Sequence, residues 1–275
     1  MRALLITILL ATPAGADTLV ACAPGYPGST REAQPTLDAF ARAVNESAGW
    51  AEGALTAVYH ETEGAGMARL SAPDASFTLV PLAFFLKHRQ ALKLEPLCQA
   101  VRQGGQASET WSLVAGKGRV PSASALDGWQ LITLAAYAPH FVRGPALAGY
   151  GPLPAGVRLD ASGSLLSGLR RAAAGEKVAL LLDGSQSAGV QSLPFAKDLE
   201  TLARSAALPA SVVCRVSARA TAERAKTLAR ALVKLHEKPS GMAALQAMQL
   251  DRFGALDEAG LRRAQQAYDA APDTP

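Results

Sequence analysis

The feature that most constrains the fold is an alternation of short apolar runs with helical patterns. Residues 18–23 form an apolar, strand-like run that ends in a stretch rich in Pro and Gly. A helical pattern then covers residues 31–47, and a second strand-like run follows at 54–59. Strands that alternate with helices predict an α/β protein with a parallel sheet covered by helices. The apolar positions with helical spacing are Ala33, Leu37, Phe40, Ala41 and Val44.

The same alternation continues along the rest of the chain. A strand–helix–strand unit is predicted around residues 157–182, in the middle of a longer series of strands and helices. The chain then ends in helices. Further strands are predicted at 77–80, 92–101, 111–115, 130–134, 199–203 and 211–216, and further helices at 63–70, 82–88, 221–236, 241–249 and 258–270.

Composition excludes several classes of protein. The 275 residues are 49% hydrophobic, which is enough for a large core, and 27 basic against 23 acidic residues give a net charge of +4. The basic residues form no run, so we expect no nucleic-acid partner. The four histidines lie far apart, the three cysteines are too few for a thiolate cluster, and no glycine-rich phosphate loop is present. We therefore expect neither a metal nor a cofactor.

The N-terminus has the pattern of a secretory signal. Arg2 precedes the apolar run 3–11, and Ala14-Gly15-Ala16 offers small residues to a peptidase. The run is too short to span a bilayer. We predict that residues 1–16 are removed and that the mature protein is periplasmic. Lipidation at Cys22 is the weaker alternative, because Asp17 separates it from the apolar run.

An enzyme is the less favoured class from the sequence. Ser185, His140 and Asp183 are the residue types of a hydrolytic triad. The glycines around Ser185 have the wrong spacing for a nucleophile elbow, however. We therefore expect a binding protein without catalytic residues.

Seven segments, in order, carry a resemblance to a known family. The chain resembles the phosphate/phosphonate type of periplasmic substrate-binding protein, a branch of the type II (transferrin-like) binding proteins, over nearly all of the mature sequence. One segment departs from the family pattern, with Lys177 where an acidic residue is usual. The segments are YP at 26–27, YHET at 59–62, FTLVPLAFF at 77–85, LDGW at 126–129, AAGEKVALLLD at 173–183, LARSAALP at 202–209 and KPSGMAAL at 238–245.

The resemblance implies two α/β lobes joined by two crossing strands, with a ligand cleft between them. Lobe 1 would comprise residues 17–112 and 185–275, and lobe 2 residues 113–184. Helix N-termini around such a cleft would suit a small anionic ligand.

The resemblance also implies a set of ligand-binding residues. The family's Ser-Thr-Ser-Gly stretch is replaced by LAAYAPHFVRG at 134–144, so an anion would depend on His140, Arg143 and the backbone. The alternative is a larger or less charged ligand stacked on tyrosines. Each residue also has a structural interpretation, such as a turn, a helix cap or a solvated helix position. The expected binding residues are Tyr26, Ser29, Thr30, Tyr59, Glu61, Leu82, Tyr137, His140, Arg143 and Asp183.

The resemblance further implies a partner and a disulfide. The partner would be an ABC-type permease, or alternatively a membrane sensor kinase, and the binding protein itself would be a monomer. Cys98 and Cys214 would lie on neighbouring strands of lobe 1, so they form the expected pair if a disulfide exists. Three separate buried thiols are favoured over this bridge, because strand phase is not fixed by the sequence.

Overall fold

A six-stranded sheet forms the centre of the first of two α/β units. The computed structural model describes residues 16–26, 28–104, 107–161 and 164–272, and the predicted signal peptide lies outside them apart from Ala16. The strand order is β13-β4-β12-β3-β1-β2, with β1, β2 and β3 parallel to one another and β12 and β13 antiparallel to their neighbours. The strands are β1 (Asp17–Cys22), β2 (Leu55–His60), β3 (Ala75–Pro81), β4 (Leu94–Arg102), β12 (Ser211–Val216) and β13 (Leu250–Gly254).

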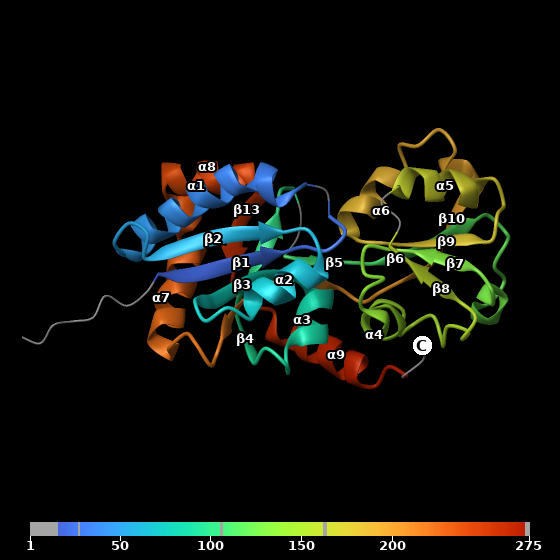
Figure 1. Cartoon of the computed structure of the whole chain (residues 1–275). Coiled ribbons are helices and arrows are strands. Elements are labelled where there is room, and N and C mark those ends of the chain that lie inside the picture. The colour runs from blue at the N-terminus through green and yellow to red at the C-terminus, as the bar shows by residue number, and fades with distance from the viewer. Residues whose placement is uncertain (1–15, 27, 105–106, 162–163, 273–275) are drawn as a thin grey trace, which may run out of the picture.

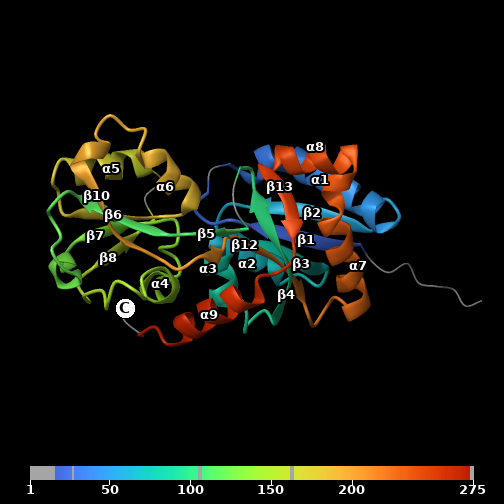
Figure 2. The same ribbon diagram turned by 180° about the vertical axis from the view of Figure 1, so that it is seen from behind.

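Helices cover both faces of this sheet (Figures 1 and 2). One face packs on α1, α7 and α8, and the other on α2 and α3. Ser29 begins α1 with a capping box, in which its side chain accepts from the Glu32 N–H and Glu32 bonds back to the Ser29 backbone. The helices are α1 (Thr30–Ala48), α2 (Glu63–Leu70), α3 (Leu82–His88), α7 (Ala222–Val233), α8 (Pro239–Ala247) and α9 (Glu258–Asp269), with a 3₁₀ turn, η4 (Leu235–Glu237).

The second unit is built on a five-stranded sheet of order β10-β6-β9-β7-β8. Strand β9 is buried at every position because both faces of the sheet are covered. Helices α5 and α6 pack on one face, and the other face packs into a core that also contains residues of α3 and α9. The strands are β6 (Ser112–Gly116), β7 (Gln130–Ile132), β8 (Arg158–Asp160), β9 (Val178–Leu182) and β10 (Leu199–Arg204). The helical segments are η1 (Ala123–Leu126), α4 (Pro139–Phe141), η2 (Val142–Ala146), α5 (Leu165–Ala173), α6 (Gly184–Val190) and η3 (Ala196–Asp198).

Two antiparallel segments join the units. Strands β5 (Ser108–Glu109) and β11 (Leu208–Pro209) pair with each other at the crossing. Beside them, the Trp111 N–H donates to Ser205 Oγ at 2.9 Å and the Ser205 N–H donates to the Trp111 carbonyl at 2.8 Å. Both crossing strands therefore move together if the units rotate.

The return crossing lies later in the chain than the expected boundary between residues 184 and 185. Strand β10 pairs antiparallel with β6, so residues 199–204 belong to the second sheet. The expected strand at 199–203 is present, but sequence does not show which sheet a strand joins. The chain forms α6 and η3 on the second unit before β10 leads back to β11.

The C-terminal helix α9 reaches from the first unit to the second (Figures 1 and 2). It packs on η2, where a Cβ built on Gly144 would lie 2.3 Å from the Ala267 carbonyl oxygen. Asp269 forms an ion pair with Arg89, which follows α3, at 2.5 Å. The absence of a side chain at Gly144 therefore allows this close approach of helix and second unit.

The structure contradicts the expected pairing of Cys98 with Cys214. The two residues lie on neighbouring strands, but Cys98 belongs to the core under α1 and α7, and Cys214 to the core on the opposite face. Cys98 pairs with Val213, the residue before Cys214. Successive side chains of a strand alternate between faces, so strands can be neighbours while their cysteines face apart. Each of the three thiols is free and buried.

Cys22 is the last residue of β1, which lies between β3 and β2 in the sheet. Cleavage just before a lipidated Cys22 would remove the rest of this strand. The weaker alternative of lipidation therefore conflicts with the sheet. Among the described residues, no helix combines the length and apolar character needed to cross a membrane.

Candidate functional site

A cavity of about 1150 Å³ lies between the two units. The first unit contributes the ends of β1, β3 and β4, and the second contributes the segment after β7 and the start of α6. Much of the wall is apolar, including Leu37, Leu79, Ile132 and Met248. Among the described lining residues, Arg102 is the one basic side chain and Asp183 the one acidic side chain.

The turn after β1 places Tyr26 at this cavity. Gly25 has a φ of 81°, and a Cβ there would lie 3.2 Å from Leu134 Cδ2 of the second unit. Glycine is the residue that adopts this conformation without strain and permits the close approach. Tyr26 Oη donates to Asp183 Oδ2 at 2.8 Å, and burial, followed by the negative charge of Asp183, raises the pKa of Tyr26.

Asp183 directly follows β9 and caps α6. Its Oδ1 accepts from the Gln186 N–H at 2.8 Å and from Ser185 Oγ at 2.9 Å, while Gln186 Oε1 accepts from the Asp183 N–H. The side chain is fully buried. A helix N-terminus favours a carboxylate through its free N–H groups and its dipole. Both carboxylate oxygens therefore have hydrogen-bond donors despite their burial.

Arg102 ends β4 and bonds to both units. Its Nη2 donates to Tyr26 Oη at 2.8 Å, and its Nη1 lies 3.3 Å from Asp183 Oδ2 and 3.2 Å from Ser185 Oγ. The guanidinium carbon lies 5.1 Å from the centroid of the Tyr26 ring, within cation–π range. Arg102, Tyr26 and Asp183 thus form a hydrogen-bonded cluster that bridges the units.

Glu109 adds a second carboxyl group to this cluster from β5. Its Oε2 accepts from the Gly184 N–H at 3.3 Å. Burial, and after it the negative charge of Asp183, raises the pKa of Glu109 to about 7, although Arg102 acts in the opposite direction. The charge of the cluster therefore changes close to neutral pH.

The expected residues of the first unit divide between the cavity and local structure. Tyr59, at the end of β2, lines the cavity with Tyr26. Ser29 caps α1, whereas the Thr30 N–H and Oγ1 donate to Glu61 Oε2 at 3.1 and 2.6 Å. Glu61 thereby satisfies the N-terminus of α1, and neither it nor Thr30 is among the lining residues.

Leu82, Tyr137, His140 and Arg143 are not among the residues that line the cavity. Leu82 is buried in the core, and the Tyr137 carbonyl accepts from Lys87 Nζ at 2.5 Å. The His140 ring packs 5.4 Å from the Tyr268 ring of α9. Arg143 is buried and donates to the Leu153 carbonyl at 3.2 Å. His140 and Arg143 are therefore not placed to hold an anion in the cavity, because their segment forms α4 and η2, which pack into the core and against α9.

Arg102 is the main residue that sequence analysis missed. It directly follows the strand predicted at residues 92–101, and ligand residues gather at the carboxyl ends of strands. Nothing in the sequence pairs it with Asp183, 81 residues away. Other unanticipated polar lining residues are Thr36, Gln103, Thr133, Ser185, Gln186, Ser211 and Gln249.

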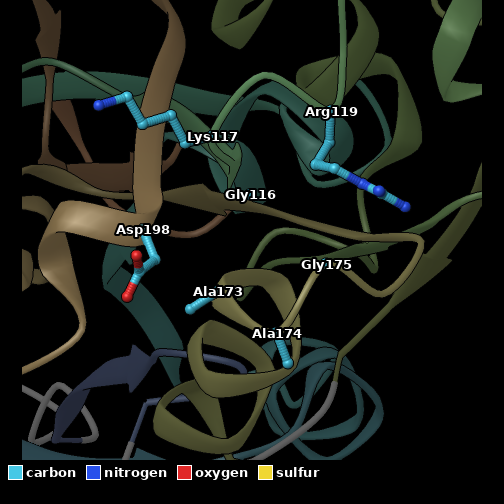
Figure 3. Close-up of a pocket in the computed structure, with 7 residues that line it drawn as sticks. All are labelled: Gly116, Lys117, Arg119, Ala173, Ala174, Gly175 and Asp198. Carbon is cyan, nitrogen blue, oxygen red and sulfur yellow. The ribbon is translucent and has the colours of Figure 1, made fainter.

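A smaller hollow of about 200 Å³ lies on the second unit alone (Figure 3). Gly116 and the C-terminal end of α5 form its floor, and the side chains of Lys117 and Arg119 point away from each other. We regard it as a surface feature, because it gathers no convergent polar groups. Within the described part of the chain, no cluster of three or more His, Cys, Asp or Glu side chains is placed to hold a metal ion.

Comparisons with known proteins identify the fold. The sequence matches no family model and no curated protein. The structure is similar to XAC2383 from Xanthomonas citri, in its chloride-bound form, with a TM-score of 0.70 and 18% identity over 93% of this chain and 96% of that one. The same protein bound to ATP gives a TM-score of 0.68, with 18% identity over the same shares of the two chains.

Two phosphonate-related proteins are also similar. The binding-protein component of an ABC phosphonate transporter from Pseudomonas aeruginosa has a TM-score of 0.61 and 13% identity, over 92% of this chain and 88% of that one. PhnD1 from Prochlorococcus marinus, solved with methylphosphonate, has a TM-score of 0.60 and 10% identity, over 92% and 97%. The chain therefore has the type II periplasmic-binding-protein fold, as the sequence predicted, with a cavity between its two α/β units.

Proposed function

We propose that this chain is an exported, non-catalytic solute-binding protein that captures a small organic anion between its units. The observation that supports this most directly is the cavity of about 1150 Å³, which both units line. Arg102 is the one basic residue among the described residues of its lining. Its apolar wall suits a ligand with a hydrocarbon part. We further propose that the units act as lobes, residues 17–111 with 205–275 and residues 112–204.

Delivery to an ABC-type permease is part of this proposal. Residues 1–16 would direct export to the periplasm, and rotation of the lobes about the paired crossings β5 and β11 would enclose the ligand. A membrane sensor would use the same ligand-driven closure. Genes for a permease and an ATPase beside this one would support transport, whereas a histidine kinase gene would support sensing.

Native mass spectrometry of protein recovered from the periplasm tests ligand capture. The expected mass is that of residues 17–275 with a noncovalent small-molecule adduct. The variant Leu134→Trp fills the cavity with a larger side chain and should lose the adduct. Leu166→Trp is the matched control, since Leu166 is exposed on α5 outside the cavity. An adduct that survives Leu134→Trp, or wild-type protein without one, would contradict the proposal.

A further inference from the structure

Among the described residues that line the cavity, one ion pair is present, and it joins the two units. Arg102 belongs to the first unit and Asp183 to the second, and their closest nitrogen and oxygen atoms are 3.3 Å apart. Building on the proposed function, we propose that Arg102 binds the carboxylate of the ligand, and that Asp183 competes with the ligand for this guanidinium. Arg102 would then be the residue that selects for ligand charge.

The bonds of Asp183 support an exchange of this kind. Ser185 Oγ and the Gln186 N–H, both in the same unit as Asp183, donate to its Oδ1. Tyr26 Oη donates to Oδ2 at 2.8 Å, shorter than the Arg102 contact at 3.3 Å. Asp183 therefore keeps charge-stabilising donors when Arg102 turns to another anion, so the exchange leaves no bare buried carboxylate.

The bonds of Arg102 leave it dependent on the opposite unit. Within its own unit it contacts Tyr26, through Nη2 and the face of the ring. Its bonds to Asp183 and Ser185 both cross between the units. When the units separate, the guanidinium loses its hydrogen-bonded carboxylate, Asp183, while Glu109 stays nearby in the same unit. Arg102 then presents a cation on the cavity wall. A ligand carboxylate accepts from the planar guanidinium in the same way as Asp183 does.

The surrounding charges indicate a singly charged ligand. Asp183 lines the cavity, and Glu109 lies next to it against the Gly184 N–H. A doubly charged group on Arg102 would face the repulsion of these carboxyl groups with one cation to balance it. The apolar wall, with Leu37, Ile132 and Met248, would accommodate a hydrocarbon body. The ligand class is thus a monocarboxylate with an apolar body, distinct from phosphate and phosphonate dianions.

Calorimetry with sodium hexanoate at pH 8 tests the exchange. The protein is first freed of ligand by unfolding, dialysis and refolding. Asp183→Asn should bind hexanoate at least tenfold more tightly than wild type, because it removes the competitor while asparagine still caps α6. Arg102→Gln should lose detectable binding, alone and combined with Asp183→Asn. Neutral hexanamide should bind all of these proteins equally, and inorganic phosphate should bind more weakly than hexanoate.

Glu109→Gln is the matched control for charge alone. It removes a nearby carboxyl group that attracts the Arg102 guanidinium without a hydrogen bond to it among those described. Its effect on hexanoate affinity should therefore be smaller than that of Asp183→Asn. Three results would overturn the proposal: an unchanged affinity in Asp183→Asn, retained binding in Arg102→Gln, or equal gains in Glu109→Gln and Asp183→Asn.

Small-angle scattering separates this inference from the proposed function. Ligand-free Asp183→Asn should be more extended than ligand-free wild type, because the ion pair between the units is gone; equal dimensions would count against the competition. If Arg102→Gln keeps a periplasmic adduct that Leu134→Trp loses, the ligand-binding function stands and the role of Arg102 fails. If the variants change hexanoate affinity as expected but the periplasmic protein carries no adduct, the competition at Arg102 stands and the proposed ligand-capture function fails.

Discussion

Single residues in the structure carry charge and contact constraints that can be tested one at a time. Glu109 is held in the folded protein at a pKa of about 7, raised from the ordinary 4.5 by burial and then by Asp183. A raised carboxyl pKa means that the folded state binds the proton more tightly than the unfolded chain. The stabilisation is fully present below pH 4.5 and is lost as the pH rises through 7.

We therefore expect Glu109→Gln to flatten this part of the stability profile. Between pH 5 and pH 8, measured by urea unfolding, the wild-type free energy of unfolding should fall relative to that of the variant. The physical reason is that glutamine stays neutral where the buried carboxyl group must ionise. Parallel profiles for the two proteins would show that Glu109 does not titrate in this range.

Gly66 and Gly64 offer a matched pair within α2. A Cβ on Gly66 would lie 2.1 Å from Cys22 Sγ and 2.9 Å from Cys22 Cβ, while a Cβ on Gly64 has open space around it. Gly66→Ala should lower the free energy of unfolding by about 1–3 kcal/mol through overpacking. Gly64→Ala should be neutral or stabilise by up to about 1 kcal/mol. Urea denaturation compares them, and equal effects would contradict the packing argument.

At the scale of elements, the position of α9 depends on a tertiary contact. Its sequence specifies a helix, and Asp257 caps it by accepting from the Gly260 N–H at 2.9 Å. Its docking on η2 depends on Gly144, where no side chain separates the backbones. Helix formation and helix placement therefore have different causes here.

Gly144→Ala should loosen α9 without unfolding the second unit. The added Cβ would meet the Ala267 carbonyl oxygen at 2.3 Å, so we expect a loss of about 1–3 kcal/mol and faster hydrogen exchange across residues 258–269. Gly149→Ala is the control, since its Cβ meets nothing within 4 Å. Unchanged exchange in α9 would mean that the helix and η2 shift to absorb the methyl group.

At the scale of the whole molecule, two units meet at a charged cluster and at paired crossings. Ligand binding should stabilise this arrangement by mass action. Hydrogen exchange of ligand-loaded protein, compared with refolded ligand-free protein, should show protection at residues 132–134, 183–186 and 205–208. Residues 140–143 should show no change, because they lie outside the cavity. Protection confined to 140–143 would restore the site expected from the sequence.

Much of the fold follows from local sequence patterns. The alternation of strand and helix patterns predicted most of the elements, from β1 and α1 to α9, because apolar periodicity and caps act over a few residues. It missed β13, which directly follows a predicted helix, and the two-residue strands β5 and β11. Such short or edge strands form because distant segments pair with them, and the local sequence does not specify that pairing.

The candidate site also combines features set by local sequence with features set by distant contacts. Sequence alone determined that Tyr59 lies at the end of a strand and that Tyr26 and Asp183 follow strands of a covered sheet, since turn residues and apolar runs set those positions. The tertiary structure decided that Arg102 meets Asp183, that β10 joins the second sheet, and that Cys98 and Cys214 face apart. These outcomes depend on contacts between distant segments and on strand phase, where a shift of one residue reverses the face that a side chain occupies.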